Sequence, residues 1–309
     1  MRAIQVKNVE QGIALVEADI HQPNPGKDEI LIRVHAVGVT PSELLWYPTI
    51  HTRDGAPRLH AVPGHEFSGA VAAVGANAGG FEVSQEVYGM SDWFADGATA
   101  EFCLAQSSSI AAKPASLTHE EAATVPIGAL TAWQGLIERA KVLPGERVLV
   151  HGGSGAVGLF AIQLAHLRGA HVIATASSGN LDLVKQLGAD EAIDYRAGRF
   201  EDQVGKVDVV FDTVGGEILD RSWRVLTHSG RMVAIAADSE GTTDQRVKDA
   251  FFIVEANRKQ LAEIARMLDA GELKTFVNAA VPLEEAPRAY AGSLATRRGY
   301  GKVVVSVAG

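Results

Sequence analysis

A glycine-rich stretch at residues 153–158 has the residue types and the spacing to bind a phosphate group. Its G-x-G-x-x-G spacing directly follows an apolar run at 147–151, and apolar residues continue through 159–167 before a second run at 172–174. This order predicts a strand, a tight turn, a helix and a second strand, which together form a βαβ unit. The first glycine makes the tight turn, and the second lets the main chain approach a pyrophosphate closely. The third lets the helix pack against the strand. The residues expected to bind a dinucleotide are Gly153, Ser154, Gly155, Ala156, Val157 and Gly158.

The residues after the second strand bear on which dinucleotide binds. NAD-binding units carry a carboxylate about 20 residues after the glycines, where it accepts hydrogen bonds from the ribose. This chain has Ser177 and Ser178 there, and its first acidic residue, Asp182, falls within the next expected helix. Small hydroxyl side chains leave room for a 2′-phosphate and donate hydrogen bonds to it, whereas a carboxylate repels it. The sequence therefore favours NADP over NAD, and the serines also suit a role as caps of the next helix.

Composition limits the class of protein. The 309 residues are 47% hydrophobic and 21% charged, which suits a chain with a large core and, by its length, two domains. A net charge of −9 argues against nucleic acid or an anionic membrane as the main partner, because both bind basic surfaces. The single cysteine, Cys103, excludes a disulfide framework within one chain. With no signal peptide and no membrane-spanning apolar run, the expected location is the cytoplasm.

The pattern of elements changes near residue 115. Short β-rich runs separated by proline and glycine precede it, and a helix at about 120–140 then opens an alternation of helices and strands. Such an alternation predicts an α/β fold with a doubly wound parallel sheet that binds ligands at its carboxyl edge. The apolar run 251–254 is expected to form a further strand that pairs across a two-fold axis and makes a homodimer. The expected domains are 1–117 with 260–309, and 118–259.

A second motif, Gly64-His65-Glu66, adds a family resemblance over essentially the full length. With Phe67-Ser68-Gly69 after it and Gly301-Lys302-Val303-Val304 near the end, it resembles the G-H-E signature of medium-chain dehydrogenases and reductases. Within that family the chain is most similar to the zinc-free quinone oxidoreductase branch, which includes crystallin-like members. The resemblance implies a GroES-like β domain for substrate and a Rossmann NADP-binding domain that enclose the nicotinamide in a cleft.

The zinc ligands of related alcohol dehydrogenases are incomplete in this chain. In zinc-dependent members a cysteine follows the Val-Gly-Val strand and binds metal with the histidine of G-H-E. Here Thr40 follows Val37-Gly38-Val39, and no four-cysteine lobe exists. Because catalytic zinc normally needs three protein ligands, His65 and Glu66 leave the set incomplete. We therefore expect no metal site, and a structural role for His65 in the loop or the cleft wall.

The absence of a zinc site favours chemistry that needs little Lewis-acid help. Hydride addition to a quinone or to the β-carbon of an enone places charge on an oxygen, which a hydrogen bond stabilises. The expected reaction is NADPH-dependent reduction of a small quinone or α,β-unsaturated carbonyl. Two alternatives remain: a zinc-independent alcohol or acyl-thioester reductase, and a crystallin-like protein that binds NADPH without turnover.

The resemblance also implies roles for individual residues. Thr40 corresponds to a position beside the nicotinamide, often Asn in relatives, and Tyr195 belongs with Ser177 and Ser178 to the 2′-phosphate region. A lysine that many relatives place near Asn180 is missing. Further cofactor contacts are expected from Thr131, Thr213, Ile235 and Arg297, although Arg297 or Arg298 is equally compatible with a solvated surface charge.

The proton donor has the least support in the sequence. Tyr47 lies in the expected substrate loop and has a hydroxyl that suits donation to a carbonyl, while Trp46 suits stacking on a flat substrate. Simple packing explains both residues equally well. Glu43 stands where many relatives carry Asp, and His151 before the glycine turn is expected to pack rather than react.

Overall fold

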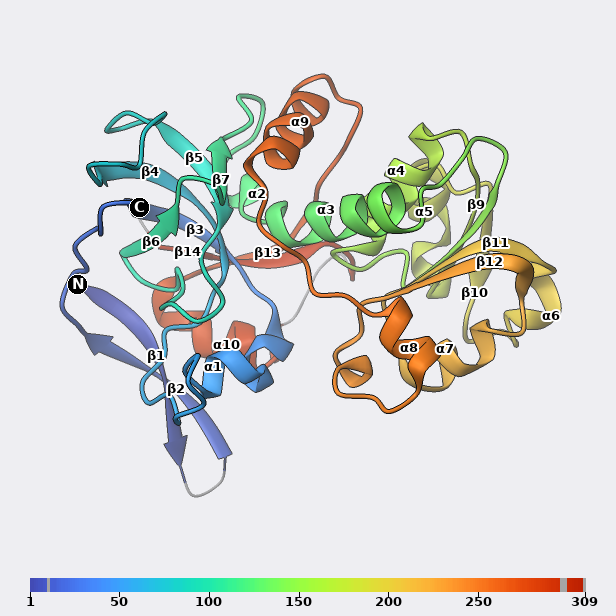
Figure 1. Cartoon of the computed structure of the whole chain (residues 1–309), viewed down its shortest axis with the longest axis horizontal. Coiled ribbons are helices and arrows are strands. Elements are labelled where there is room, and N and C mark those ends of the chain that lie inside the picture. Colours follow the sequence, from blue (N-terminus) through green and yellow to red (C-terminus); the bar gives the residue numbers. More distant parts are fainter. Residues whose placement is uncertain (10–11, 295–298, 308–309) are drawn as a thin grey trace. The chain divides into compact units, whose positions relative to one another are not determined.

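The computed structural model describes residues 1–9, 12–294 and 299–307, which belong to two compact units (Figure 1). The first unit comprises 1–127, 256–298 and 302–309, and the second comprises 128–255 and 299–301. The division into functional domains at 117/118 and 259/260 stays a prediction. No helix in the described part of the chain is both long and apolar enough to cross a membrane.

The first unit is built on a seven-stranded sheet. Its order is β13-β14-β3-β4-β5-β7, with β6 also paired to β3. Strand β14 runs antiparallel to β3, with Val304 opposite Gly38, whereas β13 and β14 are parallel. A separate hairpin precedes the sheet. The strands are β1 (Arg2–Val9), β2 (Gly12–Asp19), β3 (Glu29–Gly38), β4 (Glu66–Val74), β5 (Glu86–Met90), β6 (Phe102–Gln106), β7 (Ile110–Ala112), β13 (Val277–Pro282) and β14 (Lys302–Ser306).

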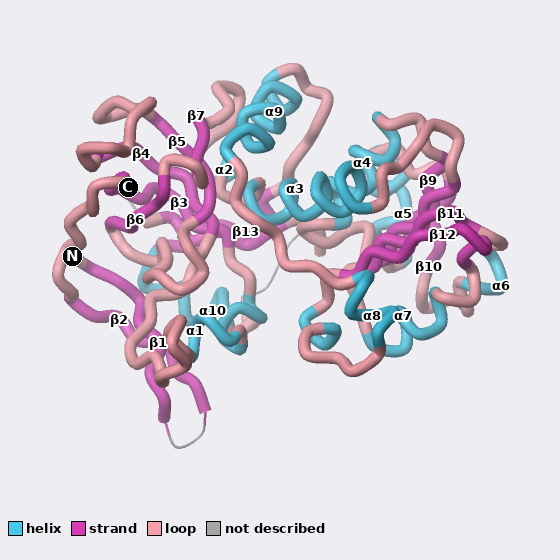
Figure 2. The backbone as a smooth tube through the Cα atoms, viewed as in Figure 1, coloured by secondary structure: helices cyan, strands magenta, loops and turns pink. Residues whose placement is uncertain are grey.

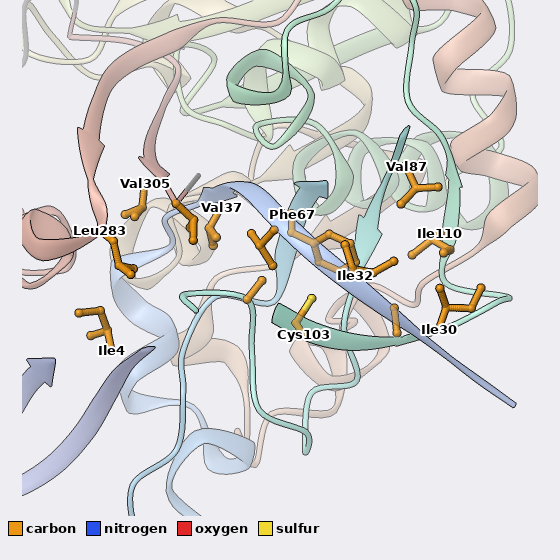
Figure 3. Close-up of a cluster of buried hydrophobic side chains, with 14 of the residues drawn as sticks. Ile4, Ile30, Ile32, Val37, Phe67, Val87, Cys103, Ile110, Leu283 and Val305 are labelled. Carbon is orange, nitrogen blue, oxygen red and sulfur yellow. The ribbon is translucent and has the colours of Figure 1, made fainter. Parts of the chain in front are cut away.

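The core of the first unit follows from alternation along its strands. In β3 one face carries the exposed Arg33 and the buried Leu31, while the side chains of Ile30 and Ile32 share the other face and are fully buried. Phe67 packs with them, and Cys103 points into the same cluster (Figure 3), where burial raises the pKa of its thiol. The thiol is therefore a core group. Short helices complete the unit: η1 (Pro41–Leu45), α1 (Tyr47–Ile50), α2 (His119–Ala122), α9 (Arg258–Asp269), η5 (Leu283–Glu285) and α10 (Ala286–Tyr290).

The second unit contains a five-stranded sheet in the order β10-β9-β8-β11-β12, and each pairing in it is parallel. Helices α4 and α5 lie on one face, and α7 and α8 lie on the other (Figure 2). The predicted α/β class with a doubly wound parallel sheet is thus confirmed. Its elements are β8 (Arg147–His151), α4 (Gly158–Leu167), β9 (His171–Ala176), η3 (Ser178–Asn180), α5 (Leu181–Gln186), β10 (Glu191–Asp194), α6 (Glu201–Val204), β11 (Val207–Asp212), α7 (Gly216–Ser222), β12 (Leu226–Ala234), η4 (Ala237–Ser239) and α8 (Gln245–Ala250).

Two expected elements differ in the structure. The helix expected at 120–140 is interrupted after α2 and resumes as α3 (Pro126–Trp133), because Pro126 has no N–H to continue the earlier turn, and a π-helical segment (Gln134–Arg139) follows. The run 251–254 does not form a strand. Only Phe251 pairs with the sheet, through one parallel bridge to Ala234, which is the last residue of β12.

Candidate functional site

The glycine turn between β8 and α4 combines close packing with one open position. A Cβ on Gly158 would lie 2.2 Å from the Gly152 carbonyl oxygen, and one on Gly153 would lie 2.9 Å from Cδ1 of Ile162. These two glycines therefore let the helix lie against the strand. A Cβ on Gly155 would meet only the Gly152 oxygen, at 3.3 Å. No other heavy atom of the described residues beyond its chain neighbours lies within 4 Å of that Cβ position, which suits the close approach of a bound pyrophosphate.

The carboxyl end of β9 carries hydroxyl and amide groups. Ser177 is half-buried, Ser178 is exposed and Asn180 is buried. The Asn180 amide donates hydrogen bonds to the Ser177 hydroxyl at 3.3 Å and to the Gly299 carbonyl at 3.1 Å. These bonds fix the Ser177 side chain at the end of the strand. These neutral groups suit a bound 2′-phosphate, whereas a carboxylate at the same place would repel it.

Tyr195 follows β10, the neighbouring strand, and lies at the same edge of the sheet. Its backbone N–H donates to the Ala176 carbonyl at 3.3 Å, and half of the residue is exposed. The guanidinium carbon of Arg196 lies 5.3 Å from the centre of the Tyr195 ring. Sequence reasoning missed Arg196, although its place directly after Tyr195 marks it as a cation near the end of β9. It adds a positive charge directly after Tyr195, in a chain that lacks the lysine many relatives place near Asn180.

The remaining residues predicted to contact the cofactor lie in different parts of the chain. Thr213 and Ile235 follow β11 and β12, so both lie at the carboxyl edge of the sheet. The Thr213 hydroxyl donates to the His151 carbonyl at 2.8 Å. Thr131 lies on α3 and is buried. Arg297 lies outside the described residues.

His151, at the end of β8, is a buried packing residue. Its ring nitrogens lie 3.1 Å from the Thr175 hydroxyl and 2.9 Å from the Ser222 hydroxyl. Burial, with a smaller contribution from the Arg221 charge, lowers the pKa of His151 to about 3, and the Glu201 charge opposes the shift. The imidazole is therefore neutral at neutral pH and joins two hydroxyl groups across the interior.

In the first unit, Thr40 lies beside a buried ion pair. The side chain of Lys302 is 6% exposed, and its ammonium group contacts the Glu66 carboxylate. The same ammonium donates a hydrogen bond to the Thr40 hydroxyl at 3.4 Å. The other Glu66 oxygen accepts the Ile127 N–H at 3.0 Å. Lys302 appeared in the sequence only as part of the closing motif, yet it joins the G-H-E segment to Thr40.

His65 lies in a neighbouring buried cluster. Its Nδ1 atom is 3.8 Å from a carboxylate oxygen of Glu43, and both side chains are almost fully buried. The Gly64 N–H donates to the other Glu43 oxygen. The His65 ring lies 5.3 Å from the Trp93 ring, and neither ring nitrogen has a hydrogen-bond partner. These contacts place His65 in the wall of the unit.

Trp46 joins η1 to α1, and Tyr47 is the first residue of α1. Tyr47 is 48% exposed, and its ring stacks on His51 with 4.3 Å between ring centres. Trp46 packs edge-on against Trp93, with 5.3 Å between centres. The Tyr47 hydroxyl is thus available to solvent or ligand, whereas Trp46 has a protein partner.

The residues around Thr40 do not fit a catalytic zinc ion. Within the described ranges, no three His, Cys, Asp or Glu side chains form a group able to hold a metal. Thr40 offers a hydroxyl that already accepts from a cation, and the Lys302 ammonium satisfies Glu66. The oxygens of Thr40 and Glu66, both already bonded to the Lys302 ammonium, are not the nitrogen and sulfur ligand set that zinc prefers.

Two family models match the chain. Residues 26–132 match "Alcohol dehydrogenase GroES-like domain", and residues 187–305 match "Zinc-binding dehydrogenase". The first match bears out the GroES-like domain expected from the resemblance.

Individual proteins match over nearly the whole length. A probable zinc-binding oxidoreductase of Arthroderma benhamiae is 34% identical, over 92% of this chain and 90% of its own. The human quinone oxidoreductase is 30% identical, over 99% and 97%. The NADPH-dependent alkenal/one oxidoreductase of Arabidopsis thaliana is 33% identical, over 94% and 75%. The solved quinone oxidoreductase of Coxiella burnetii superimposes with a TM-score of 0.87 at 28% identity, covering 100% of this chain and 99% of that one.

Proposed function

This chain is a medium-chain dehydrogenase/reductase of the quinone oxidoreductase branch, and from that premise we propose that it reduces quinones or α,β-unsaturated carbonyls with NADPH and without zinc. It is an oxidoreductase, and its family uses nicotinamide cofactors. The name of the human relative supports a quinone as substrate. The name of the Arabidopsis relative supports an unsaturated carbonyl as substrate and NADPH as cofactor.

The uncrowded main chain at Gly155 is the observation that carries the cofactor proposal. Gly153 and Gly158 are needed for packing, whereas a Cβ on Gly155 would meet a single atom, the Gly152 oxygen at 3.3 Å, which leaves room there for an approaching group. A structural turn does not need that space, but a pyrophosphate does. When bound, the nicotinamide would supply the hydride, and Ser177, Ser178 and Tyr195 would hold the 2′-phosphate.

The groups around Thr40 support a reaction without metal. A hydride acceptor whose carbonyl becomes an oxyanion needs a nearby hydrogen-bond donor, and the Thr40 hydroxyl is one. We assign Thr40 and Tyr47 to the substrate side, and Thr131, Thr213, Ile235 and, beyond the described residues, Arg297 to cofactor contacts. A homodimer also belongs to this proposal, but not through the predicted strand at 251–254, because that run forms only one bridge to β12.

Steady-state oxidation of NADPH and NADH against quinones, enones, aldehydes and acyl thioesters tests this function, using protein dialysed against a chelator. We expect turnover with quinones or enones, a preference for NADPH and no gain on adding zinc. Turnover only with aldehydes or thioesters would support the alcohol or acyl-thioester alternative. Tight NADPH binding without any turnover would support a crystallin-like role.

A further inference from the structure

Lys302 is a buried cation whose side chain reaches the hydroxyl of a partly exposed residue, Thr40. Its ammonium group contacts Glu66 and donates to Thr40, while only 6% of its side chain is exposed. Thr40 is half-buried. A buried lysine is costly without partners, so its position here needs a reason beyond filling space.

The fold brings these three groups together through neighbouring strands. The Val39 N–H donates to the Val303 carbonyl at 2.9 Å, which places the end of β3 beside the start of β14. Gly38 leaves room for the carboxylate from β4, because a Cβ there would lie 2.8 Å from Cδ of Glu66. The Ile127 N–H then holds one Glu66 oxygen and leaves the other for Lys302. The arrangement is fixed by backbone pairing and not by a loop.

The direction of the Lys302 hydrogen bond leaves the Thr40 hydroxyl able to donate to another group. An ammonium group has only donors, so the Thr40 oxygen accepts from Lys302. The hydrogen of the Thr40 hydroxyl is then free to point elsewhere. A hydroxyl that accepts from a cation is also a better donor, because hydrogen bonds in a chain polarise one another.

We propose that Lys302 and Thr40 form a proton relay that protonates the substrate oxygen during reduction, an inference that rests on the proposed function. The hydride forms a C–H bond at the β-carbon of an enone, and the π electrons move to the carbonyl oxygen. The Thr40 O–H bond breaks as its proton passes to that oxygen and gives an enol. A Lys302 N–H proton passes to the Thr40 oxygen, and the neutral amine regains a proton from water before the next turnover.

The charges around Lys302 suit this exchange. Burial lowers its pKa to about 7, and the Glu43 carboxylate from η1 opposes that shift. Glu66 from β4 is the other charged group in contact with the ammonium. An acid with a pKa near the working pH both holds and releases a proton readily. Since the relay needs protonated Lys302, the rate is expected to fall as the pH rises through about 7.

Thr40→Val and Thr40→Ser test the relay, because the first removes the hydroxyl at nearly constant shape and the second restores it. We expect Thr40→Val to lower kcat for an enone by about 100-fold and to lose the alkaline fall in kcat, with little change in KM. Thr40→Ser should keep both properties. Thr227→Val, at a half-buried threonine of the second unit, is the matched control and should behave as wild type.

A titration of the protein without cofactor gives an independent measurement. Lysines labelled with carbon-13 at Cε are followed by NMR, and Lys302→Arg identifies the Lys302 signal. The signal should titrate at the pH of the alkaline fall in wild-type kcat. Titration only near the ordinary lysine value, or an unchanged pH profile in Thr40→Val, overturns the relay while leaving the reductase function intact.

Two further outcomes distinguish the relay from donation by Tyr47 and from failure of the proposed reductase function. If Tyr47→Phe loses the alkaline fall and Thr40→Val keeps it, Tyr47 is the donor and the relay is wrong. If the wild-type protein reduces neither quinones nor enones, the proposed function fails and the relay fails with it.

Discussion

The ammonium nitrogen of Lys302 lies 3.4 Å from the hydroxyl oxygen of Thr40, across the junction of β14 and β3. The resemblance to zinc-dependent relatives implies a cysteine ligand at the position of Thr40. We propose that in this chain the Lys302 ammonium supplies, next to Thr40, the positive charge that the metal supplies in those enzymes.

The glycine turn predicts different outcomes for two similar substitutions. Gly155→Ala should weaken NADPH binding about 10-fold or more and lower the free energy of unfolding by less than about 1 kcal/mol, because its Cβ meets a single backbone atom, the Gly152 oxygen, at 3.3 Å. Gly158→Ala should destabilise by about 1–3 kcal/mol, because its Cβ meets the Gly152 oxygen. Urea denaturation and cofactor titration measure the two effects. Equal loss of stability in both variants would contradict the assignment of Gly155 to the ligand.

The end of β9 predicts a change of cofactor preference. Ser177→Asp places a carboxylate where NAD-binding units carry one, and it would repel a 2′-phosphate. We expect kcat/KM for NADPH to fall by about 10-fold or more and the preference to move toward NADH. Ser177→Asn is the uncharged control of the same size. An equal loss with both cofactors would instead indicate damage to the Asn180 hydrogen bonds.

His151 predicts a pH dependence of stability. Its folded pKa of about 3 lies below its ordinary value of 6.5, so the unfolded chain binds more protons between these values. Stability should therefore fall as the pH drops from 6.5 toward 3, by an amount on the order of 4 kcal/mol from this group. His151→Gln should be less stable at neutral pH but show a shallower fall. Parallel curves for the two proteins would contradict a buried neutral imidazole.

The Glu66–Lys302 pair predicts non-additive stability changes. Glu66→Gln leaves the ammonium buried without its counter-charge and should cost about 3–5 kcal/mol. The double variant Glu66→Gln with Lys302→Met removes both charges, and it should be more stable than Glu66→Gln alone. Chemical denaturation of the four proteins gives the coupling. Additive losses would show that the two groups do not interact.

The cofactor half of the molecule was largely predictable from sequence. The turn at Gly153–Gly158 has a local spacing rule, and Ser177 and Tyr195 could be assigned to one edge because parallel strands end at the same edge of a sheet. The prediction of a strand at 251–254 was wrong, because an apolar run does not by itself show that the backbone pairs with a neighbouring strand. Phe251 bridges the last residue of β12, and the run then leaves the sheet.

The substrate half was less predictable, because its key contacts join residues far apart in the chain. Lys302 is separated from Glu66 by more than two hundred residues, and no local spacing links them. The only signal was a lysine at the start of an otherwise apolar strand. Its partner could be found only once the register of β14 against β3 was known.

The most direct test of the central claim follows the hydride itself. Chelator-treated protein is incubated with an enone and NADPH deuterated at the hydride-donating carbon, and the product is examined by mass spectrometry and NMR. We predict one deuterium at the β-carbon of the saturated product, with the same yield when zinc is added. Product without deuterium at that carbon, or product only after zinc is restored, would contradict the account.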